Sequence, residues 1–131
     1  MKPLIILPTD KTPKIDFTEH VFQLSGMSIP KDYQLFYNSI YEYLDLYAKS
    51  IKPHNCTIVE MGLAYTCKEG MYYIEKLLQK FVKMHCEDHE VMIAWFFCDT
   101  SISVKVGENL SNKLNFPFIY IDIHDYFWLD D

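Results

Sequence analysis

A nearly continuous apolar run, Val91–Cys98, constrains the fold of this chain more than any other segment. All eight of its residues are apolar, and several are β-branched or aromatic, which favours a strand. A polar turn, Glu87–Glu90, precedes the run, which is too short for a fully buried helix. Such a run is typical of a central strand, and we expect both of its faces to be covered.

Two longer segments have apolar residues at the spacing that is typical of amphipathic helices. The first is Tyr33–Ser50, with Asp32 as N-cap or first-turn acid, and the second is about Met71–Met84. Over residues 99–115 we expect a loop and then a helix. Shorter apolar segments predict strands at 2–8, 14–17, 20–25, 57–63 and 116–123.

The predicted order is an opening group of strands, followed by helices that alternate with strands. Strands separated by helices pair in parallel through right-handed crossovers, whereas the opening strands form an antiparallel hairpin. We therefore expect an α/β (α+β mixed) fold: a single-layer mixed sheet with an N-terminal hairpin and two to three helices packed on it. The chain has 131 residues, and we expect a single domain over 1–131.

The charge and hydropathy of the chain argue against several classes of partner. The net charge is −6, all twelve basic residues are lysine, and arginine is absent. Because arginine supplies bidentate contacts to phosphates and guanine edges, we do not expect nucleic-acid binding. No apolar run approaches the roughly 18 residues that a membrane span needs, and the apolar start is too short for a signal peptide. We therefore expect a cytoplasmic protein with no membrane partner.

Signatures of catalysis are absent from the sequence, which has no Walker loop, no G-x-G-x-x-G, no G-x-S-x-G and no H-E-x-x-H. The segment His85–His89 places two histidines four residues apart beside Cys86, which is a spacing that metal ligands use on a helix. An alternative function is therefore a small metal- or thiol-dependent enzyme that uses His85, His89 and a cysteine. Polar residues at the end of a helix explain the segment more simply, so we expect no metal and no other cofactor. The cysteines form no C-x-x-C pair and are expected to be free thiols: Cys56, Cys67, Cys86 and Cys98.

The segment Thr66–Glu69 has both a structural and a functional interpretation. Its T-x-x-E pattern, between a predicted strand and a predicted helix, is the signature of a capping box. In that arrangement Thr66 is the N-cap, its hydroxyl accepts from the Glu69 amide, and the Glu69 carboxylate reaches back to Thr66. Thr66→Asp is then expected to leave the stability almost unchanged, because aspartate is also a good N-cap. The functional interpretation is a phosphoacceptor, since a phosphate there meets free amides and the positive end of the helix dipole.

The first predicted helix carries more tyrosines than one apolar face needs. One interpretation is that they edge the core with their hydroxyls in water. The other is an interface, because tyrosine is enriched where proteins bind one another. On this basis we expect a partner-binding surface at Tyr33, Tyr37 and Tyr41.

Separate segments of the chain also have the order and spacing of one protein family. Residues 9–17, TDKTPKIDF, are similar to its T-x-x-T-P-x-I-x-F start, and residues 24–47 are similar to its G-x-S-x-P-E-N segment and the helix that follows. Residues 91–97, VMIAWFF, resemble its strand ending in W-x-Y/F, while 106–110, VGENL, and 116–118, FPF, match its closing A-G-E and P-F pieces. Over about positions 4–121 the chain therefore resembles the SiaC family of bacterial regulatory phosphoproteins.

The resemblance implies a non-enzymatic signalling adaptor with a small mixed α/β fold, loosely similar to the STAS type. In this family a partner kinase phosphorylates a threonine in an L-x-Y-x-N-T-S-S motif, between a strand and a helix, and a PP2C-type phosphatase removes the phosphate. The unphosphorylated form binds a partner, a diguanylate cyclase in the named system, and promotes cyclic-di-GMP synthesis.

This chain departs from the family motif, because N-T-S-S is replaced by Tyr-Thr-Cys-Lys at 65–68. Alignment by strand register places Thr66 on the phosphoacceptor, with Glu69 as the helix cap beside it. Alignment without gaps from the helix places Tyr65 there instead. We prefer the strand register, because the core fixes which face of a strand is buried. The acidic run that often precedes A-G-E is replaced by residues 99–103, and a phosphate-independent interaction domain is a further alternative.

Overall fold

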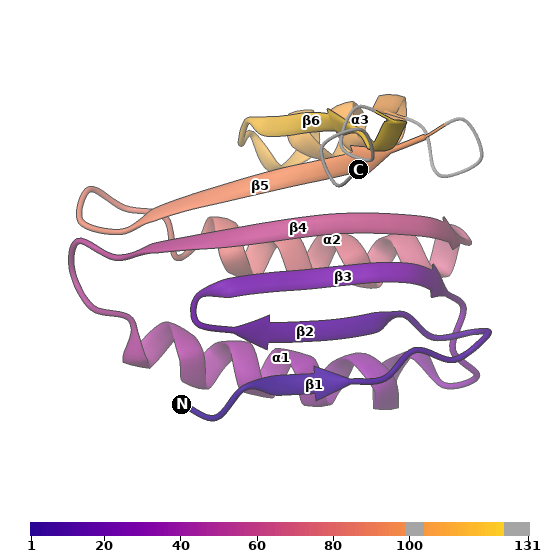
Figure 1. Ribbon diagram of the computed structural model, residues 1–131, viewed down its shortest axis with the longest axis horizontal. Coiled ribbons are helices and arrows are strands. Elements are labelled where there is room, and N and C mark those ends of the chain that lie inside the picture. The colour runs from indigo at the N-terminus through magenta and orange to yellow at the C-terminus, as the bar shows by residue number, and fades with distance from the viewer. Residues whose placement is uncertain (99–103, 125–131) are drawn as a thin grey trace.

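The computed structural model describes residues 1–98 and 104–124 (Figure 1). The expected loop at 99–103 and the end of the chain at 125–131 lie outside the described residues. The elements are β1 Leu4–Ile6, β2 Lys14–Thr18, β3 Val21–Ser28, α1 Tyr33–Ser50, β4 Cys56–Thr66, α2 Lys68–Val82, β5 Glu90–Phe97, α3 Val104–Leu114 and β6 Phe118–Asp122.

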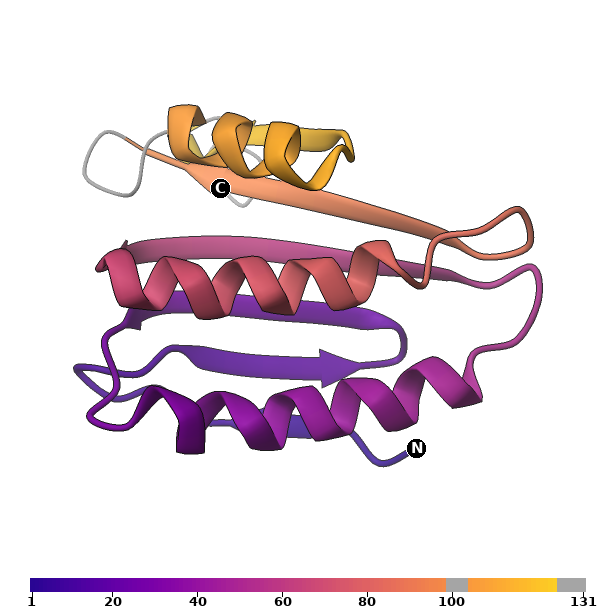
Figure 2. The same cartoon turned by 180° about the vertical axis from the view of Figure 1, so that it is seen from behind.

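The strands form one six-stranded sheet whose spatial order, β1-β2-β3-β4-β5-β6, is also their order in the sequence. The pairs β1–β2 and β2–β3 are antiparallel, and the pairs from β3 to β6 are parallel. Right-handed crossovers that all step in one direction place every helix on the same face of a sheet. Figures 1 and 2 show α1, α2 and α3 on one side of the strands. The predicted mixed sheet with an N-terminal hairpin and packed helices is confirmed.

The expectation that the Val91–Cys98 run is covered on both faces is wrong. In β5, Ile93 and Trp95 are buried beneath the helices, whereas Met92 is 37% exposed on the other face. None of the described helices covers that second face (Figure 2). The run correctly predicts a strand between two neighbours, but the face that the helices take depends on the direction of the crossovers, which the run does not encode.

The core lies between the sheet and the helices and is rich in aromatic rings. Phe22 of β3 lies between Phe17 and Phe81, with ring centroids 5.5 Å and 5.0 Å away. Gly107 lets α3 approach β5 closely, because a Cβ at this position would lie 2.8 Å from the Trp95 ring. Only a glycine fits there without moving the helix or the indole.

The ends of the elements differ from the predicted ones mainly around β4 and α2. The predicted helix Tyr33–Ser50 is confirmed, and Asp32 caps it by accepting from the Leu35 amide at 3.0 Å. The α2 helix begins at Lys68, three residues before the expected start at Met71. The β4 strand continues beyond 57–63 to Thr66, because β3 pairs with it along this whole length.

Candidate functional site at the β4–α2 junction

A β-bulge reorients the side chains at the end of β4. In the ladder between β3 and β4, Gly26 pairs with Leu63 and Met27 pairs with Tyr65, so Ala64 is the extra residue. After the bulge Thr66 is buried and Tyr65 is 51% exposed, although strict alternation from Leu63 would have reversed them. The alignment by strand register therefore places the phosphoacceptor on the buried hydroxyl of Thr66. The alignment without gaps places it on the exposed hydroxyl of Tyr65.

The Thr66 side chain joins the ends of β3 and β4 to the first turn of α2. Its Oγ1 donates to the Ser28 carbonyl oxygen at 2.6 Å, and the residue is only 9% exposed. A Cβ at position 70 would lie 1.8 Å from this Oγ1, so the close packing depends on Gly70. The hydroxyl is thus enclosed between a backbone carbonyl and the helix.

The expected capping box of Thr66 and Glu69 is wrong. The N-cap of α2 is Cys67, which makes no side-chain cap hydrogen bond, and the Thr66 hydroxyl donates to Ser28 instead of accepting from Glu69. The reason is that Thr66 is still paired with Ser28 in the sheet, so the helix starts one residue later than the pattern requires. Glu69 is then the second residue of the helix, where its charge still favours the helix dipole.

The thiol of Cys67 lies at the N-terminus of α2 and is hydrogen-bonded to a tyrosine. Its Sγ is 2.9 Å from Tyr33 Oη. This bond, together with the amides of Gly70 and Glu69, lowers the pKa of the Cys67 thiol. Burial and the bond to Cys67 raise the pKa of the Tyr33 phenol. The Tyr33 phenol therefore stays protonated at neutral pH and can donate to the sulfur.

The tyrosines of α1 pack against Tyr73 of α2. The Tyr73 ring stacks on Tyr33 and on Tyr37, with centroid distances of 5.5 Å on each side. Tyr41 donates to the Tyr73 carbonyl at 2.7 Å. This stack joins the two helices next to the junction, and Ser28 connects it to Thr66, because Ser28 Oγ is 2.6 Å from Tyr37 Oη.

The expected interface residues therefore separate into two groups. Tyr37 is fully buried, and burial raises its pKa to about 12, so its assignment to an exposed partner surface is wrong. It lies on the core face of α1 with Ile40, Leu44 and Tyr47. Tyr33 and Tyr41 are half-buried, and each keeps part of its ring at the surface.

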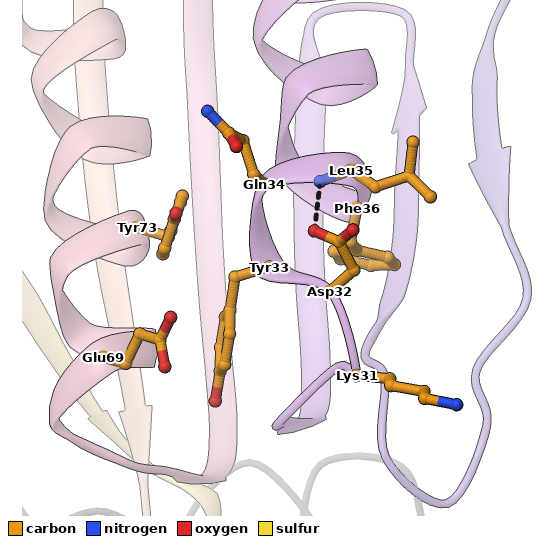
Figure 3. Close-up of a pocket in the computed structure, with 8 residues that line it drawn as sticks. All are labelled: Lys31, Asp32, Tyr33, Gln34, Leu35, Phe36, Glu69 and Tyr73. Atoms are coloured by element: carbon orange, nitrogen blue, oxygen red, sulfur yellow. Dashed lines mark hydrogen bonds between the residues drawn. The ribbon is translucent and has the colours of Figure 1, made fainter.

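An open hollow of about 900 Å³ lies beside the junction, between the starts of α1 and α2 (Figure 3). Tyr33 at the start of α1 faces Glu69 and Tyr73, which both come from α2, and Leu35 is 74% exposed at the edge of the hollow. The hollow thus combines aromatic rings, two carboxylates, one lysine and an exposed aliphatic side chain, a mixture that suits a protein surface. Its lining residues are Lys31, Asp32, Tyr33, Gln34, Leu35, Phe36, Glu69 and Tyr73.

The structure does not bring His85, Cys86 and His89 together as ligands. The α2 helix ends at Val82, so the two histidines do not share a helical face. His85 Nδ1 accepts from the Val91 amide, whereas the buried His89 is bonded to Thr57. Within residues 1–98 and 104–124, no group of three or more His, Cys, Asp or Glu side chains is placed to hold a metal ion.

Three residues of this site were missed by the sequence analysis: Ser28, Cys67 and Tyr73. Tyr73 could have been found, because it follows Glu69 by four residues and so lies on the same side of the helix. Cys67 could have been found only from the true start of α2. Ser28 is the serine of the G-x-S-x-P segment, but its contact with Thr66 could not have been found, because nothing in the sequence sets the register between β3 and the end of β4.

Comparison with known proteins identifies relatives of this arrangement. The model of one family, described as SiaC family regulatory phosphoprotein, matches residues 6–123. SiaC of Pseudomonas aeruginosa has a similar structure, with a TM-score of 0.78 and 15% identity over 92% of this chain and 97% of that one. A search of curated proteins gave no match.

Two further solved structures share the fold. One is the crystal structure of the diguanylate cyclase SiaD in complex with its activator SiaC from Pseudomonas aeruginosa, with a TM-score of 0.78 and 16% identity over 91% of this chain and 98% of that one. The other is apo-SiaC from the same organism, with a TM-score of 0.65 and 16% identity over 93% and 98% of the two chains. Among the described residues, no helix is both long enough and apolar enough to cross a membrane.

Proposed function

We propose a function from a premise that the match over residues 6–123 establishes: this chain belongs to the SiaC family of regulatory phosphoproteins. We infer that it is a non-enzymatic, cytoplasmic adaptor that binds a protein partner and carries no cofactor. The solved complex of a SiaC with the diguanylate cyclase SiaD makes a cyclase of this kind the first partner to test. The state of Thr66 would control the binding.

The observation that carries this proposal is the enclosure of the Thr66 hydroxyl. Its Oγ1 donates to the Ser28 carbonyl at 2.6 Å and occupies the space next to Gly70. Phosphorylation removes that donor hydrogen and adds about two negative charges and three acceptor oxygens. A phosphate cannot remain beside a carbonyl oxygen and a helix turn, so the side chain would have to rotate outward. Modification of Thr66 would therefore change the shape of the junction as well as its charge.

The hollow beside the junction is the surface through which we expect the partner to sense this change. Tyr33 and Glu69 reach from the starts of α1 and α2 into the hollow, and the bond from Tyr33 to Cys67 ends next to Thr66. A rearranged Thr66 would displace Cys67 and the first turn of α2. The unphosphorylated junction, which is the one described here, is then the form that binds.

A cognate kinase and a PP2C-type phosphatase complete the proposed cycle. Because Thr66 is 9% exposed, the kinase would have to act on an opened junction. Tyr65, which is 51% exposed, is the other candidate for modification. Phosphopeptide mass spectrometry of the protein from its own host separates these sites, with Thr66→Ser as a variant that keeps a hydroxyl and Thr66→Val as one that does not.

We expect phosphate on Thr66 and weaker binding of the cyclase by the phosphorylated protein. Phosphate on Tyr65 alone would transfer the switch to the exposed residue. If Thr66→Val binds the partner normally and no phosphate is found under any growth condition, the chain is a phosphate-independent interaction domain.

A further inference from the structure

Four hydrogen-bonded side chains, His20, Tyr47, Thr57 and His89, form a relay that enters the molecule at the opposite end of β4 from Thr66. His20 Nδ1 is 2.8 Å from Tyr47 Oη, Tyr47 Oη is 2.6 Å from Thr57 Oγ1, and Thr57 Oγ1 is 2.7 Å from His89 Nε2. These residues come from the turn between β2 and β3, the last turns of α1, the start of β4 and the turn before β5. The relay therefore connects four separate segments of the sequence.

The relay runs from the surface to a buried ring nitrogen that has no hydrogen-bond partner. His20 is half-buried, whereas Tyr47, Thr57 and His89 are 5%, 0% and 3% exposed. His89 Nδ1 is buried and makes no hydrogen bond. Buried polar atoms are normally paired, and each exception needs an explanation.

The number of hydrogens in the relay limits the directions in which its hydrogen bonds can be donated. The three links need three hydrogens, and the hydroxyls of Tyr47 and Thr57 supply one each. The third must come from one of the two imidazoles. If both hydroxyl hydrogens stay within the relay, either His20 donates inward and His89 accepts at Nε2, or His89 donates outward and His20 accepts at Nδ1. In the first arrangement His89 carries its hydrogen on the unpartnered Nδ1, and in the second it carries it on Nε2.

Protonation of the histidines selects between these arrangements. A protonated His20 can only donate, so it favours the inward arrangement and the Nδ1–H form of His89, the one in which both hydroxyl hydrogens stay paired. If His89 is protonated as well, both ends donate, so one of the two hydroxyls must accept twice and turn its own hydrogen out of the relay. A second imidazolium therefore leaves a buried hydroxyl hydrogen without an acceptor in the relay, which destabilises the buried arrangement.

We propose that this side-chain relay is an acid-sensitive latch, in which the proton on His20 sets the tautomer of the buried His89 and a second proton weakens the attachment of the turn before β5 to the relay. This device is independent of the proposed function at Thr66. Because β-strands rise about 3.3 Å per residue, Thr57 and Thr66 lie about 30 Å apart along β4.

The charged groups around the two ends differ. The outer end opens into a hollow of about 690 Å³ whose lining includes one carboxylate, Glu19, and one lysine, Lys52. At the inner end, the hydroxyls of Tyr47 and Thr57 are themselves part of the relay. The other titratable groups of the adjoining segments are exposed. Those groups are His54 and Cys56 before and at the start of β4, and His85, Cys86, Glu87, Asp88 and Glu90 around the turn of His89. No buried carboxylate among the described residues therefore offsets a charge on His89.

Nitrogen-15 NMR of the imidazole side chains of the full chain, from about pH 8 to pH 5.5, tests the latch, because histidine titrates in this range. In the wild type we expect the His89 signals to shift to the Nδ1–H pattern as His20 takes up its proton. Thr57→Val cuts the relay and keeps the side-chain volume, so His20 should still titrate while His89 no longer responds. Tyr47→Phe cuts the relay at its other hydroxyl and serves as the same test if Thr57→Val does not fold.

Two results would overturn the proposal. One is a wild-type His89 whose signals stay constant while His20 titrates. The other is a His89 that responds equally in the wild type and in the variants with a cut relay.

Discussion

The Thr66 hydroxyl occupies the space that a Cβ at position 70 would need, since that Cβ would lie 1.8 Å from Thr66 Oγ1 and 3.0 Å from the Ser28 carbonyl oxygen. In most helix interiors alanine is favoured over glycine by about 1 kcal/mol. Here the first turn of α2 is pressed against the end of the sheet, so the usual preference is reversed. The strand, the hydroxyl and the glycine behave as one packed unit.

Gly70→Ala is therefore expected to lower the free energy of unfolding by about 1–3 kcal/mol, because overpacking displaces Thr66 or the helix. Denaturant unfolding measures this change. Gly62→Ala is a matched control, since a Cβ there would have its nearest neighbours at 3.7 Å and 3.8 Å. A Gly70→Ala variant as stable as the wild type would show that the helix is not pressed against Thr66.

Replacements of Thr66 should follow the donor role of its hydroxyl. Thr66→Ser keeps the donor, whereas Thr66→Val leaves the Ser28 carbonyl unpaired and should cost about 1 kcal/mol. Thr66→Asp, which the capping interpretation predicts to be harmless, places a carboxylate beside that carbonyl and should cost about 1–3 kcal/mol. Thermal or denaturant unfolding should rank the variants Ser, Val, Asp in decreasing stability. An Asp variant as stable as the wild type would restore the capping interpretation.

Cys67 should be alkylated faster than the exposed Cys56 and Cys86 at about pH 7.5, because its lowered pKa increases the thiolate fraction there. Tyr33→Phe removes the donor to the sulfur, so it should raise the thiol pKa and slow the alkylation several-fold. The lowered pKa also affects stability. Because folding lowers the pKa of this thiol, its ionisation stabilises the native state above the ordinary thiol pKa, and this stabilisation is lost as the pH falls through the lowered pKa. Mass-resolved iodoacetamide kinetics over a pH series compares the wild type with Tyr33→Phe, and an unchanged rate in the variant would contradict the role of the bond.

Two exposed leucines on α1 provide a test of the proposed partner surface. Leu35 is 74% exposed at the edge of the hollow, and Leu46 is 58% exposed further along the same helix, outside the lining of the hollow. Leu35→Ala should weaken binding of the partner cyclase by about tenfold or more, which corresponds to roughly 1.4 kcal/mol, whereas Leu46→Ala should leave it unchanged. Titration calorimetry with both folded variants measures the difference. Equal effects of the two substitutions would exclude the hollow as the binding surface.

The sequence predicts the elements of this fold well, because their signals are local. The helical period of Tyr33–Ser50 and the apolar run of β5 each reflect a pattern within one segment. The candidate site is harder to predict, because it depends on how two segments meet. A single bulge at Ala64 reverses which of Tyr65 and Thr66 is buried, and the sheet pairing of Thr66 makes Cys67 the N-cap of α2 in its place. Neither feature produces a repeating pattern of apolar residues, so neither can be predicted from the sequence of one segment.

The order of the strands bears on how the protein can be made in the cell. Because each strand pairs only with strands next to it in the sequence, every new strand emerging from the ribosome meets a sheet edge that is already formed. The hairpin of β2 and β3 can form first, and each helix–strand unit then adds one further parallel strand. None of the described strands has to wait for a partner made much later, which limits the time during which an unpaired edge is open to aggregation during synthesis.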